Sequence, residues 1–490
     1  MNSKQFIACA TILSGALAAQ AAGFALYGGS TKGMALGGAV MGRAVDASAN
    51  FYNPATLTDF TNTVITLGGC MEVPRANVQV HHEGSRFSGK LNSGAFYLPH
   101  FYIAQPLPWD FTFGLGCAPE FGIGSAYRNS WPMNWNTIET TVEGFTINPN
   151  LAYKVTEDWS VSGGLRFIFI DFEQYSRPYA AKDGVKFGQM QTHLEGDNNF
   201  SGFGWQVSTK YDILDNLHFG LMYKSEAEAR VRGHYRTKVR SYDYSAAPGL
   251  VSQNLQSIVN QMLPGVVGQQ LTGMGIMPGH PAYETYYEQV AAVARPQIVA
   301  QARPKVESEV YKGIKNQVDA GARHARGHAA ADVTLPQSVI AGLDWEATET
   351  VRFGTAVTWT HWSSMDKLAF KLQGGDRTVP LKWDDVFRFS FAGAWDFSEN
   401  WTLMGSYIYD MDPCSTRKNV GSTMLPAGDR HLMTMGLAWH WGNWEIAGCY
   451  GLILMDGRPQ KYSDELGREY RFTTSAGRSH QLGLSLSYYF

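Results

Sequence analysis

The chain has 490 residues, of which 17% are charged and 13% aromatic, with 52 glycines and a net charge of -3. This charge gives no sign of a polyanionic partner, and we expect no binding of nucleic acid. The mean hydropathy of -0.22 is too polar for a bundle of membrane helices, but it does not exclude a membrane β-barrel, in which lipid-facing residues alternate with polar ones.

The N-terminus has the pattern of an export signal. Lys4 precedes an apolar run over residues 6–19, and residues 19–21 form a small-residue A-x-A cleavage site. The alternative is a membrane anchor, but the run is shorter than the roughly 20 residues that a spanning helix needs. We expect residues 1–21 to be a signal peptide that is cleaved before Ala22.

Residues 22–60 show no strand pattern. The segment is rich in small residues and glycine, and it holds Asn53-Pro54-Ala55, which by itself is most simply an ordinary turn. Because this segment precedes the first expected strand, it must lie either outside or inside the sheet that the strands form.

From residue 61 to the end, segment after segment alternates apolar and polar residues over about ten residues or more. Short links alternate with longer ones, as periplasmic turns alternate with extracellular loops in bacterial barrels. We expect fourteen strands, near residues 62–79, 92–105, 111–124, 139–155, 158–176, 199–213, 216–236, 331–346, 349–371, 384–397, 400–411, 428–441, 444–456 and 479–490.

The last strand carries the clearest alternation. One face is apolar and the other is small or polar, as in Leu482, Leu484, Leu486, Tyr488 and Phe490 against Gln481, Gly483, Ser485, Ser487 and Tyr489. A large soluble β-sandwich would also alternate, but it explains neither the export signal nor the aromatic terminus. We therefore expect an all-β fold, a 14-stranded antiparallel transmembrane β-barrel over residues 61–490 in the bacterial outer membrane.

Residues 241–330 interrupt the strand pattern after the seventh expected strand. Apolar residues recur at helical spacing, and Pro264, Pro296 and Pro304 are expected to divide the region into short helices. A loop of this length is usually functional or disordered. We expect a partly helical extracellular loop that forms an ordered cap over the outer mouth.

Several short motifs occur in order along nearly the whole mature chain. They are Ala22-Gly23-Phe24, Ser30, Gly33, Gly37-Gly38, the stretch from Asp46-Ala47 to Asn53-Pro54-Ala55, Tyr223-Lys224-Ser225-Glu226, Gly233-His234-Tyr235, Leu335-Pro336, Trp362-Ser363, Asp385 to Arg388, and Pro426 to Asp429-Arg430. In this order, and on this strand count, the sequence resembles the FadL family of outer-membrane transporters of long-chain fatty acids and other hydrophobic compounds.

The resemblance implies that residues 22–60 form a hatch that plugs the barrel, with Asn53, Pro54 and Ala55 as hatch residues. It also implies passive transport. The ligand adsorbs among the extracellular loops, moves to a deeper pocket and leaves sideways where the third strand kinks inward.

The third expected strand has residues suited to such a lateral gate, which we place at Pro119, Phe121, Gly122 and Gly124. Proline cannot donate to the ladder, and glycine favours a bend. The simpler alternative is a β-bulge at the barrel rim.

A carboxylate head group would need a cation at the end of an apolar slot. In the family, one basic residue late on the fifth strand and another just before the tenth have this role, and the resemblance carries it loosely to Arg177 and Lys382. Phe24 is a third expected ligand-binding residue. Lone basic residues at strand ends are otherwise mostly solvated.

The sequence predicts no cofactor, metal site or catalytic residue. His81-His82-Glu83 and the pair His324 and His328 are metal-capable, but each lacks a third ligand nearby. As partners we expect a hydrophobic small molecule, outer-membrane lipid and lipopolysaccharide, and the barrel-assembly machinery during biogenesis, with the protein as a monomer.

Four functions remain open from the sequence. The first is passive uptake of long-chain fatty acids or similar amphiphiles, and the second is uptake of uncharged aromatic hydrocarbons. The third is a surface adhesin or receptor on a sealed barrel, with residues 241–330 as the binding element. The fourth is an outer-membrane acyl hydrolase, whose catalytic residues could lie on separate strands and so form no recognisable sequence motif.

Overall fold

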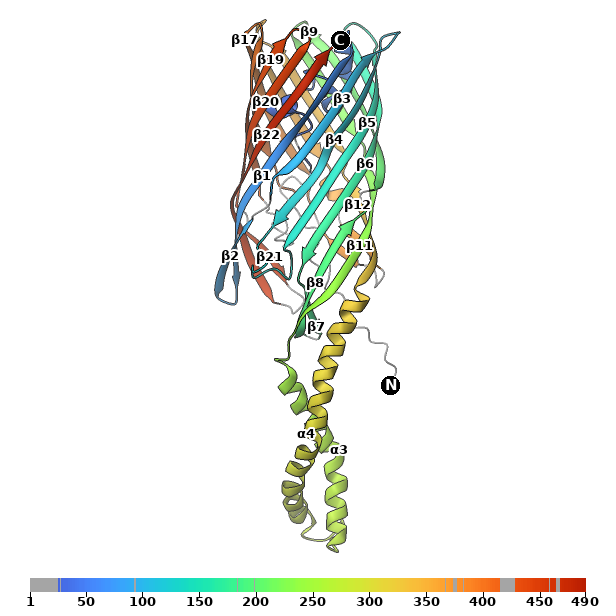
Figure 1. The fold of residues 1–490 in the computed structure, drawn as a ribbon, viewed down its shortest axis with the longest axis vertical. Helices are drawn as coiled ribbons and strands as arrows, with labels where there is room; N and C mark the ends of the chain where they lie inside the picture. Colours follow the sequence, from blue (N-terminus) through green and yellow to red (C-terminus); the bar gives the residue numbers. More distant parts are fainter. Residues whose placement is uncertain are drawn as a thin grey trace.

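The computed structural model describes residues 25–490 except 27, 92–93, 183, 198, 366, 373–376, 382, 415–427, 458 and 464–467. Its strands form one antiparallel sheet that closes into a tall barrel (Figure 1). The predicted signal peptide and Phe24 lie outside the described residues, so the structure does not place them.

The wall of the barrel is a closed ring in which each strand pairs with the next and β22 pairs with β1. Ring closure gives every strand a partner on both sides, which a sheet in lipid requires. In order the ring runs β1 (Val64–His82), β3 (Phe96–Pro106), β4 (Phe111–Ala126), β5 (Glu139–Lys154), β6 (Trp159–Ser176), β9 (Phe200–Leu214), β10 (Leu217–Lys224), β13 (Ser338–Glu346), β14 (Val351–Thr360), β17 (Val386–Ser398), β18 (Trp401–Asp410), β19 (Arg430–Trp441), β20 (Trp444–Met455) and β22 (Glu469–Tyr489).

Further strand segments lengthen the wall at one end. β11 pairs with β8 and β12, and β12 also pairs with β15. The added segments are β2 (Ser85–Leu91), β7 (Tyr179–Lys182), β8 (Val185–Gly196), β11 (Ala227–Tyr242), β12 (Arg326–Leu335), β15 (Lys367–Leu372), β16 (Arg377–Pro380) and β21 (Pro459–Ser463).

The prediction of a 14-stranded barrel, built from fourteen continuous strands, is wrong. Within the described residues the sheet has 22 strand segments. The expected strands over 216–236, 331–346 and 349–371 are each divided in two, and hairpins such as β7–β8 extend the wall. Pro336, which has no N–H for the ladder, lies between β12 and β13. The alternation of apolar and polar residues predicts which face of the sheet a side chain occupies. It does not predict where two strands stop pairing.

The expected alternation itself is confirmed in β22. Leu482, Leu484 and Leu486 are exposed on the outer face, whereas Gln481 and Ser485 are buried inside. Large exposed aromatic side chains also gather near one end of the barrel, including Trp345, Trp395, Trp441, Trp444 and Phe490. Such a girdle is typical of the membrane interface.

The two ends of the barrel differ in their connections. Residues 107–110, 155–158 and 399–400 are short turns at the end that carries the C-terminus in Figure 1. Short turns lie on the periplasmic side of bacterial barrels, so we call this end periplasmic and the opposite end extracellular.

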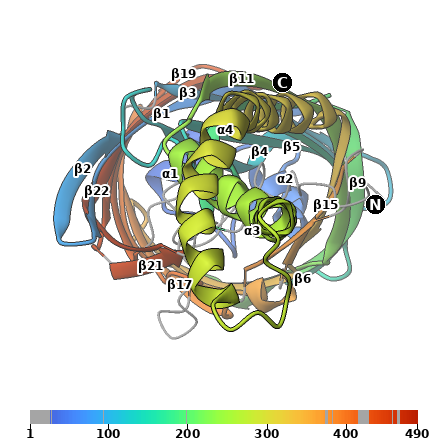
Figure 2. The ribbon, with the colours of Figure 1, turned by 90° about the horizontal axis from the view of Figure 1, so that it is seen from below.

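We call residues 25–60, apart from residue 27, which is not described, the N-terminal segment, and its residues 28–60 lie inside the barrel. It contains α1 (Thr31–Ala35), α2 (Ala49–Tyr52) and the 3₁₀ helix η1 (Pro54–Asp59), and Figure 2 shows α1 and α2 within the ring. The Ala55 amide donates to Ser208 Oγ of β9 at 3.0 Å, and Thr434 Oγ1 of β19 donates to the Ala35 carbonyl at 2.7 Å. Hydrogen bonds to opposite walls therefore hold the segment across the lumen.

The insertion over residues 241–330 forms a helical hairpin of α3 (Ala247–Gly273) and α4 (Tyr283–His324). A separate 3₁₀ helix, η2 (Trp362–Ser364), lies between β14 and β15. The hairpin extends away from the extracellular end instead of packing over the mouth as expected (Figure 1). No helix in the described part of the chain is long and apolar enough to span a membrane.

The prediction that prolines divide the insertion into short helices is also wrong. Pro264 lies inside α3, and Pro296 and Pro304 lie inside α4. Each proline removes a helical hydrogen bond. Packing of α3 against α4, in clusters that include Val267 and Ile298, compensates for this loss.

Candidate functional site

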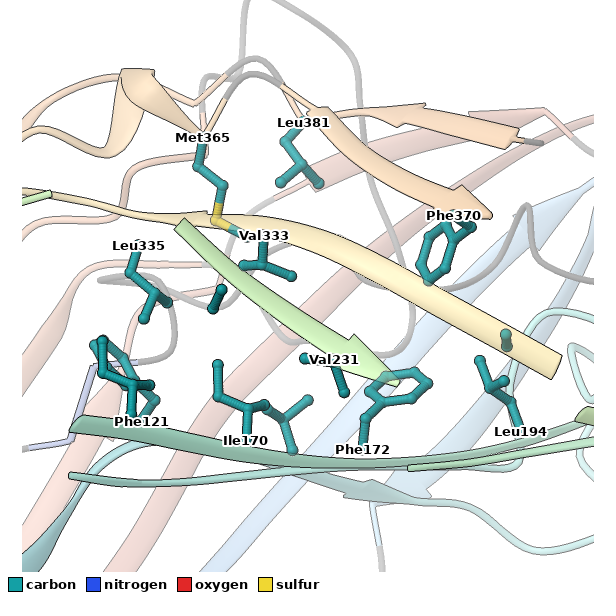
Figure 3. Packing of buried hydrophobic residues seen from close by; sticks show 14 of the residues in the cluster. Phe121, Ile170, Phe172, Leu194, Val231, Val333, Leu335, Met365, Phe370 and Leu381 are labelled. Carbon is teal, nitrogen blue, oxygen red and sulfur yellow. The ribbon is translucent and has the colours of Figure 1, made fainter. Parts of the chain in front are cut away.

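An apolar cavity of about 580 Å³ lies in the lumen toward the extracellular end. Buried side chains from several strands line it and point toward one another in Figure 3, including Ile170, Phe172, Leu194, Val231, Val333 and Phe370. The buried, inward-facing side chains Gln481 and Ser485 of β22 are polar, whereas those that line this cavity are apolar.

A second cavity, of about 830 Å³, carries charge, and we call it the cationic cavity. Arg166 of β6, Lys224 of β10 and Arg388 of β17 line it, together with Glu120 of β4. The Glu120 carboxylate accepts from Arg166 Nη2 at 2.8 Å and from Lys224 Nζ at 3.0 Å. Three cations against one carboxylate leave an excess of positive charge around the cavity.

These charged side chains are almost fully buried. Arg166 is 2% exposed, Lys224 8% and Glu120 7%. Removing one partner from a buried ion pair typically costs roughly 3–5 kcal/mol, because the other charge is left uncompensated. Arg388 Nη2 donates to Thr358 Oγ1 at 3.1 Å. The lumen wall thus holds its cations in fixed positions.

The N-terminal segment completes this cavity. Phe51 and Tyr52 of α2 line it, and Lys224 Nζ lies 4.3 Å from the centroid of the Phe51 ring. A cation over an aromatic face is stabilised by the ring quadrupole. Any movement of this segment would therefore change the surroundings of Lys224.

The wall strand β4 separates from its neighbour β3 partway along. Their pairing ends at Phe101 and Cys117, whereas β4 stays paired with β5 through a register shift between Pro119 and Phe121. A pocket of about 730 Å³, here called the wall pocket, lies at this separation. Proline and a β-bulge both interrupt ladder bonds, which explains why the separation occurs at this point.

Glycine allows other parts of the chain to approach β4 closely. A Cβ on Gly124 would clash with the Phe96 ring, and one on Gly122 would lie 2.9 Å from Leu26. The Leu26 amide donates to the Glu120 carbonyl at 2.9 Å. The start of the N-terminal segment is therefore attached to β4 at its bulge.

The wall pocket adjoins both of the other cavities. Val142 lines both the apolar cavity and the wall pocket, and Leu26 and Phe121 line both the wall pocket and the cationic cavity. An elongated molecule with one charged end could thus contact all three surfaces.

The periplasmic mouth is different in character. This space of about 2050 Å³ is lined by many charged side chains, namely Lys32, Arg43, Asp344, Glu346, Arg352, Asp396, Glu399 and Glu445. Lys32 Nζ of α1 lies 2.8 Å from Glu445 Oε2 of β20, which ties the N-terminal segment to the wall on this side.

A family model covers residues 12–270 and 283–490, and its description is outer membrane protein transport protein, OMPP1/FadL/TodX. The chain belongs to this family. The resemblance to the FadL family expected from the sequence is thereby confirmed, as is location in the outer membrane. At the level of this family the protein is a transporter rather than an enzyme.

Relatives agree with this assignment. The long-chain fatty acid transport protein of Escherichia coli O6:H1 is 21% identical over 96% of this chain and 95% of its own length. Outer membrane protein P1 of Haemophilus influenzae is 25% identical over 49% of this chain and 61% of its own length.

Solved structures support the fold alone, because their identities are low. A FadL homologue of Pseudomonas aeruginosa has a TM-score of 0.69 at 16% identity and covers 96% of this chain and 99% of its own. The toluene transporter TodX of Pseudomonas putida has a TM-score of 0.61 at 13% identity, with coverage of 94% and 98%.

The FadL resemblance pointed to Arg177 and Lys382 as head-group residues. The structure places Arg177 after β6, where its Nη1 donates to the Asn129 carbonyl at 2.8 Å. Burial and the nearby Arg240 lower the pKa of Arg177. Arg177 does not line the cationic cavity. Lys382 and Phe24 lie outside the described residues.

The expected hatch residues lie together in the lumen. Asn53 and Ala55 are fully buried, and Asn53 Nδ2 donates to the Thr209 carbonyl of β9 at 3.1 Å. The expected gate residues Pro119, Phe121, Gly122 and Gly124 all line the wall pocket. These positions fit the hatch and lateral-gate roles that the family resemblance implies. Movement of the N-terminal segment or of β4 remains a prediction.

Sequence reasoning missed Glu120, Arg166, Lys224 and Arg388 as site residues. A signal was present, since Arg166 alternates inward in the middle of a strand between Leu165 and Phe167. A charge at membrane depth is by default a functional candidate. In the part of the chain that the structure describes, no three metal-capable side chains lie together.

Proposed function

We propose that the protein carries long-chain fatty acids or similar amphiphilic carboxylates passively across the outer membrane. The observation that carries this proposal is a cationic cavity that is linked to an apolar one through the wall pocket. A carboxylate head group would bind Arg166 and Lys224, since charge-assisted hydrogen bonds to buried cations are strong and directional.

The hydrocarbon chain would lie in the apolar cavity. Each methylene moved from water to an apolar site contributes about 0.8 kcal/mol, so several buried methylenes suffice for tight capture. The apolar lining, including Ile170, Phe172 and Val231, supports this role.

We propose that the ligand leaves sideways at the wall pocket. Pro119 and Gly122 lie where β3 and β4 separate, and the N-terminal segment would act as a hatch that rearranges to open this route. Delivery into the wall returns the chain to an apolar medium without passage through water.

The fatty acid proposal is also supported by the E. coli relative, which aligns over almost the whole chain and is a long-chain fatty acid transport protein. To test it, growth and uptake on oleate and on toluene should be compared in a deletion strain with and without the restored gene. Oleate uptake should fall on deletion and return on restoration, and oleate uptake that is unchanged by deletion would rule the proposal out.

A second candidate is uptake of uncharged aromatic hydrocarbons. It is favoured by the apolar lining of the outer cavity and by fold likeness to a toluene transporter. In that case the cations of the cationic cavity would have no head group to bind. Deletion of the gene would then lower toluene uptake and leave oleate uptake unchanged.

A further inference from the structure

Glu120 occupies an unusual position in the cationic cavity. It supplies the one carboxylate among the described residues that line this cavity, and it is almost fully buried. Arg166, Lys224 and the Thr146 hydroxyl all donate to its two oxygens, at 2.8, 3.0 and 2.8 Å. These are the contacts that the head group of a carboxylate ligand would need.

A ligand carboxylate and Glu120 cannot share these donors freely. Two carboxylates at one buried site repel each other, and one of them must leave or take up a proton. A bound anionic ligand would therefore compete directly with Glu120 for Arg166 and Lys224. A neutral ligand with the same chain gains nothing from displacing it.

The backbone of Glu120 belongs to the wall pocket. Glu120 lies in the register shift between Pro119 and Phe121, and its carbonyl accepts the Leu26 amide. The Ala25 backbone also forms a bridge with Phe121. One residue thus joins the cationic cavity, the bulge of β4 and the start of the N-terminal segment.

We propose that Glu120 is a specificity-determining residue that occupies the head-group position until an anionic ligand displaces it. Its displacement loosens the contact between Leu26 and β4, so that carboxylates open the wall pocket and neutral molecules do not. This inference rests on the proposed function and adds the group that selects for charge.

The test compares wild type, Glu120→Gln and a control, Glu173→Gln, in detergent. Glu173 is a half-exposed carboxylate on β6 that lies outside the three cavities. Affinities for oleate and for oleyl alcohol should be measured, together with hydrogen–deuterium exchange of peptides that cover Leu26. Oleyl alcohol has the same chain without the charge.

We expect Glu120→Gln to bind oleate about tenfold more tightly because its internal competitor is gone, with little change for oleyl alcohol. Oleate should speed exchange at Leu26 in wild type and in Glu173→Gln, whereas oleyl alcohol should not. If Glu120→Gln does not fold, Thr146→Val, which removes one donor to Glu120, should shift oleate affinity in the same direction by a smaller factor.

Equal oleate affinity in wild type and the folded variant, or oleate binding without any change at Leu26, would overturn this inference and leave the proposed function intact. Absence of oleate binding by wild type would overturn both.

Discussion

The outer and periplasmic halves of the lumen differ sharply. The outer half has an apolar cavity whose lining includes Ile170, Phe172 and Val231. The periplasmic mouth is wider and lined by charges of both signs, among them Arg43 and Asp396. The N-terminal segment lies between them, and hydrogen bonds join it to β4, β9 and β19.

This difference indicates which way an apolar ligand can leave. A hydrocarbon chain that moved straight on would pass from an apolar lining to water and charge, and it would lose the free energy gained on entry. At the wall pocket the chain needs only to move between β3 and β4. The contrast therefore favours lateral exit over passage through the mouth.

The largest expected effect comes from placing a charge in the outer half. Val231→Asp places an unpaired carboxylate in the apolar cavity. Binding of the ligand must then remove water from this carboxylate, which costs several kcal/mol. Uptake of oleate should fall about tenfold or more. Ala394→Asp, in the periplasmic mouth, is the matched control and should leave uptake close to wild type. Equal losses in the two variants would contradict the contrast between the halves.

The next effect concerns the head group. Lys224→Met should weaken oleate binding by about tenfold or more, since a hydrogen bond to a charged group is worth about 1.5–3 kcal/mol. Binding of oleyl alcohol should hardly change. The control is Arg43→Met, which removes a cation from the mouth that pairs with Glu346. Titration of the purified proteins would measure both, and comparable losses in the two variants would place the head group elsewhere.

A smaller effect is expected at the gate. Gly122→Val adds side-chain atoms where Leu26 already approaches, which should fill the wall pocket. Uptake of oleate should fall several-fold while its affinity stays the same, because exit is slowed and binding is not. Gly393→Val, whose Cβ would have ordinary contacts at 3.6 Å or more, is the control in the periplasmic half. Wild-type uptake by Gly122→Val would argue against a lateral gate.

The smallest effect is expected from the helical hairpin. Replacing residues 252–305 with a short linker keeps the base of the hairpin, where Ala247, Ile314 and Val318 pack beside Phe187. Oleate uptake should change by about twofold or less, in the range of ordinary surface changes. If the protein were instead an adhesin on a sealed barrel, this variant would lose surface binding in a cell-attachment assay, and neither it nor the wild type would take up oleate.

Much of the fold was predictable because alternation is a local property. The outward Leu482, Leu484 and Leu486 of β22 are exposed as expected. The number of strand segments was not predictable, because interruptions of the ladder depend on pairing with distant segments. The long helices were missed for a similar reason, since packing between α3 and α4 offsets their prolines.

The candidate site was only partly predictable. Pro119 and Gly122 were correctly singled out as a place where β4 departs from regular pairing. For the head group, loose correspondence with the FadL family favoured Arg177 at the end of β6, whereas Arg166 on the same strand lines the cationic cavity. The cluster around Glu120 joins β4, β6 and β10, and only the closed ring brings these strands together.

The most direct test of the account is a structure of the protein with a brominated long-chain fatty acid bound. We predict bromine density in the apolar cavity beside Ile170 and Val231, with the carboxylate within hydrogen-bonding distance of Arg166 and Lys224. Bromine density in the periplasmic mouth near Arg43, with the cationic cavity unchanged, would contradict it.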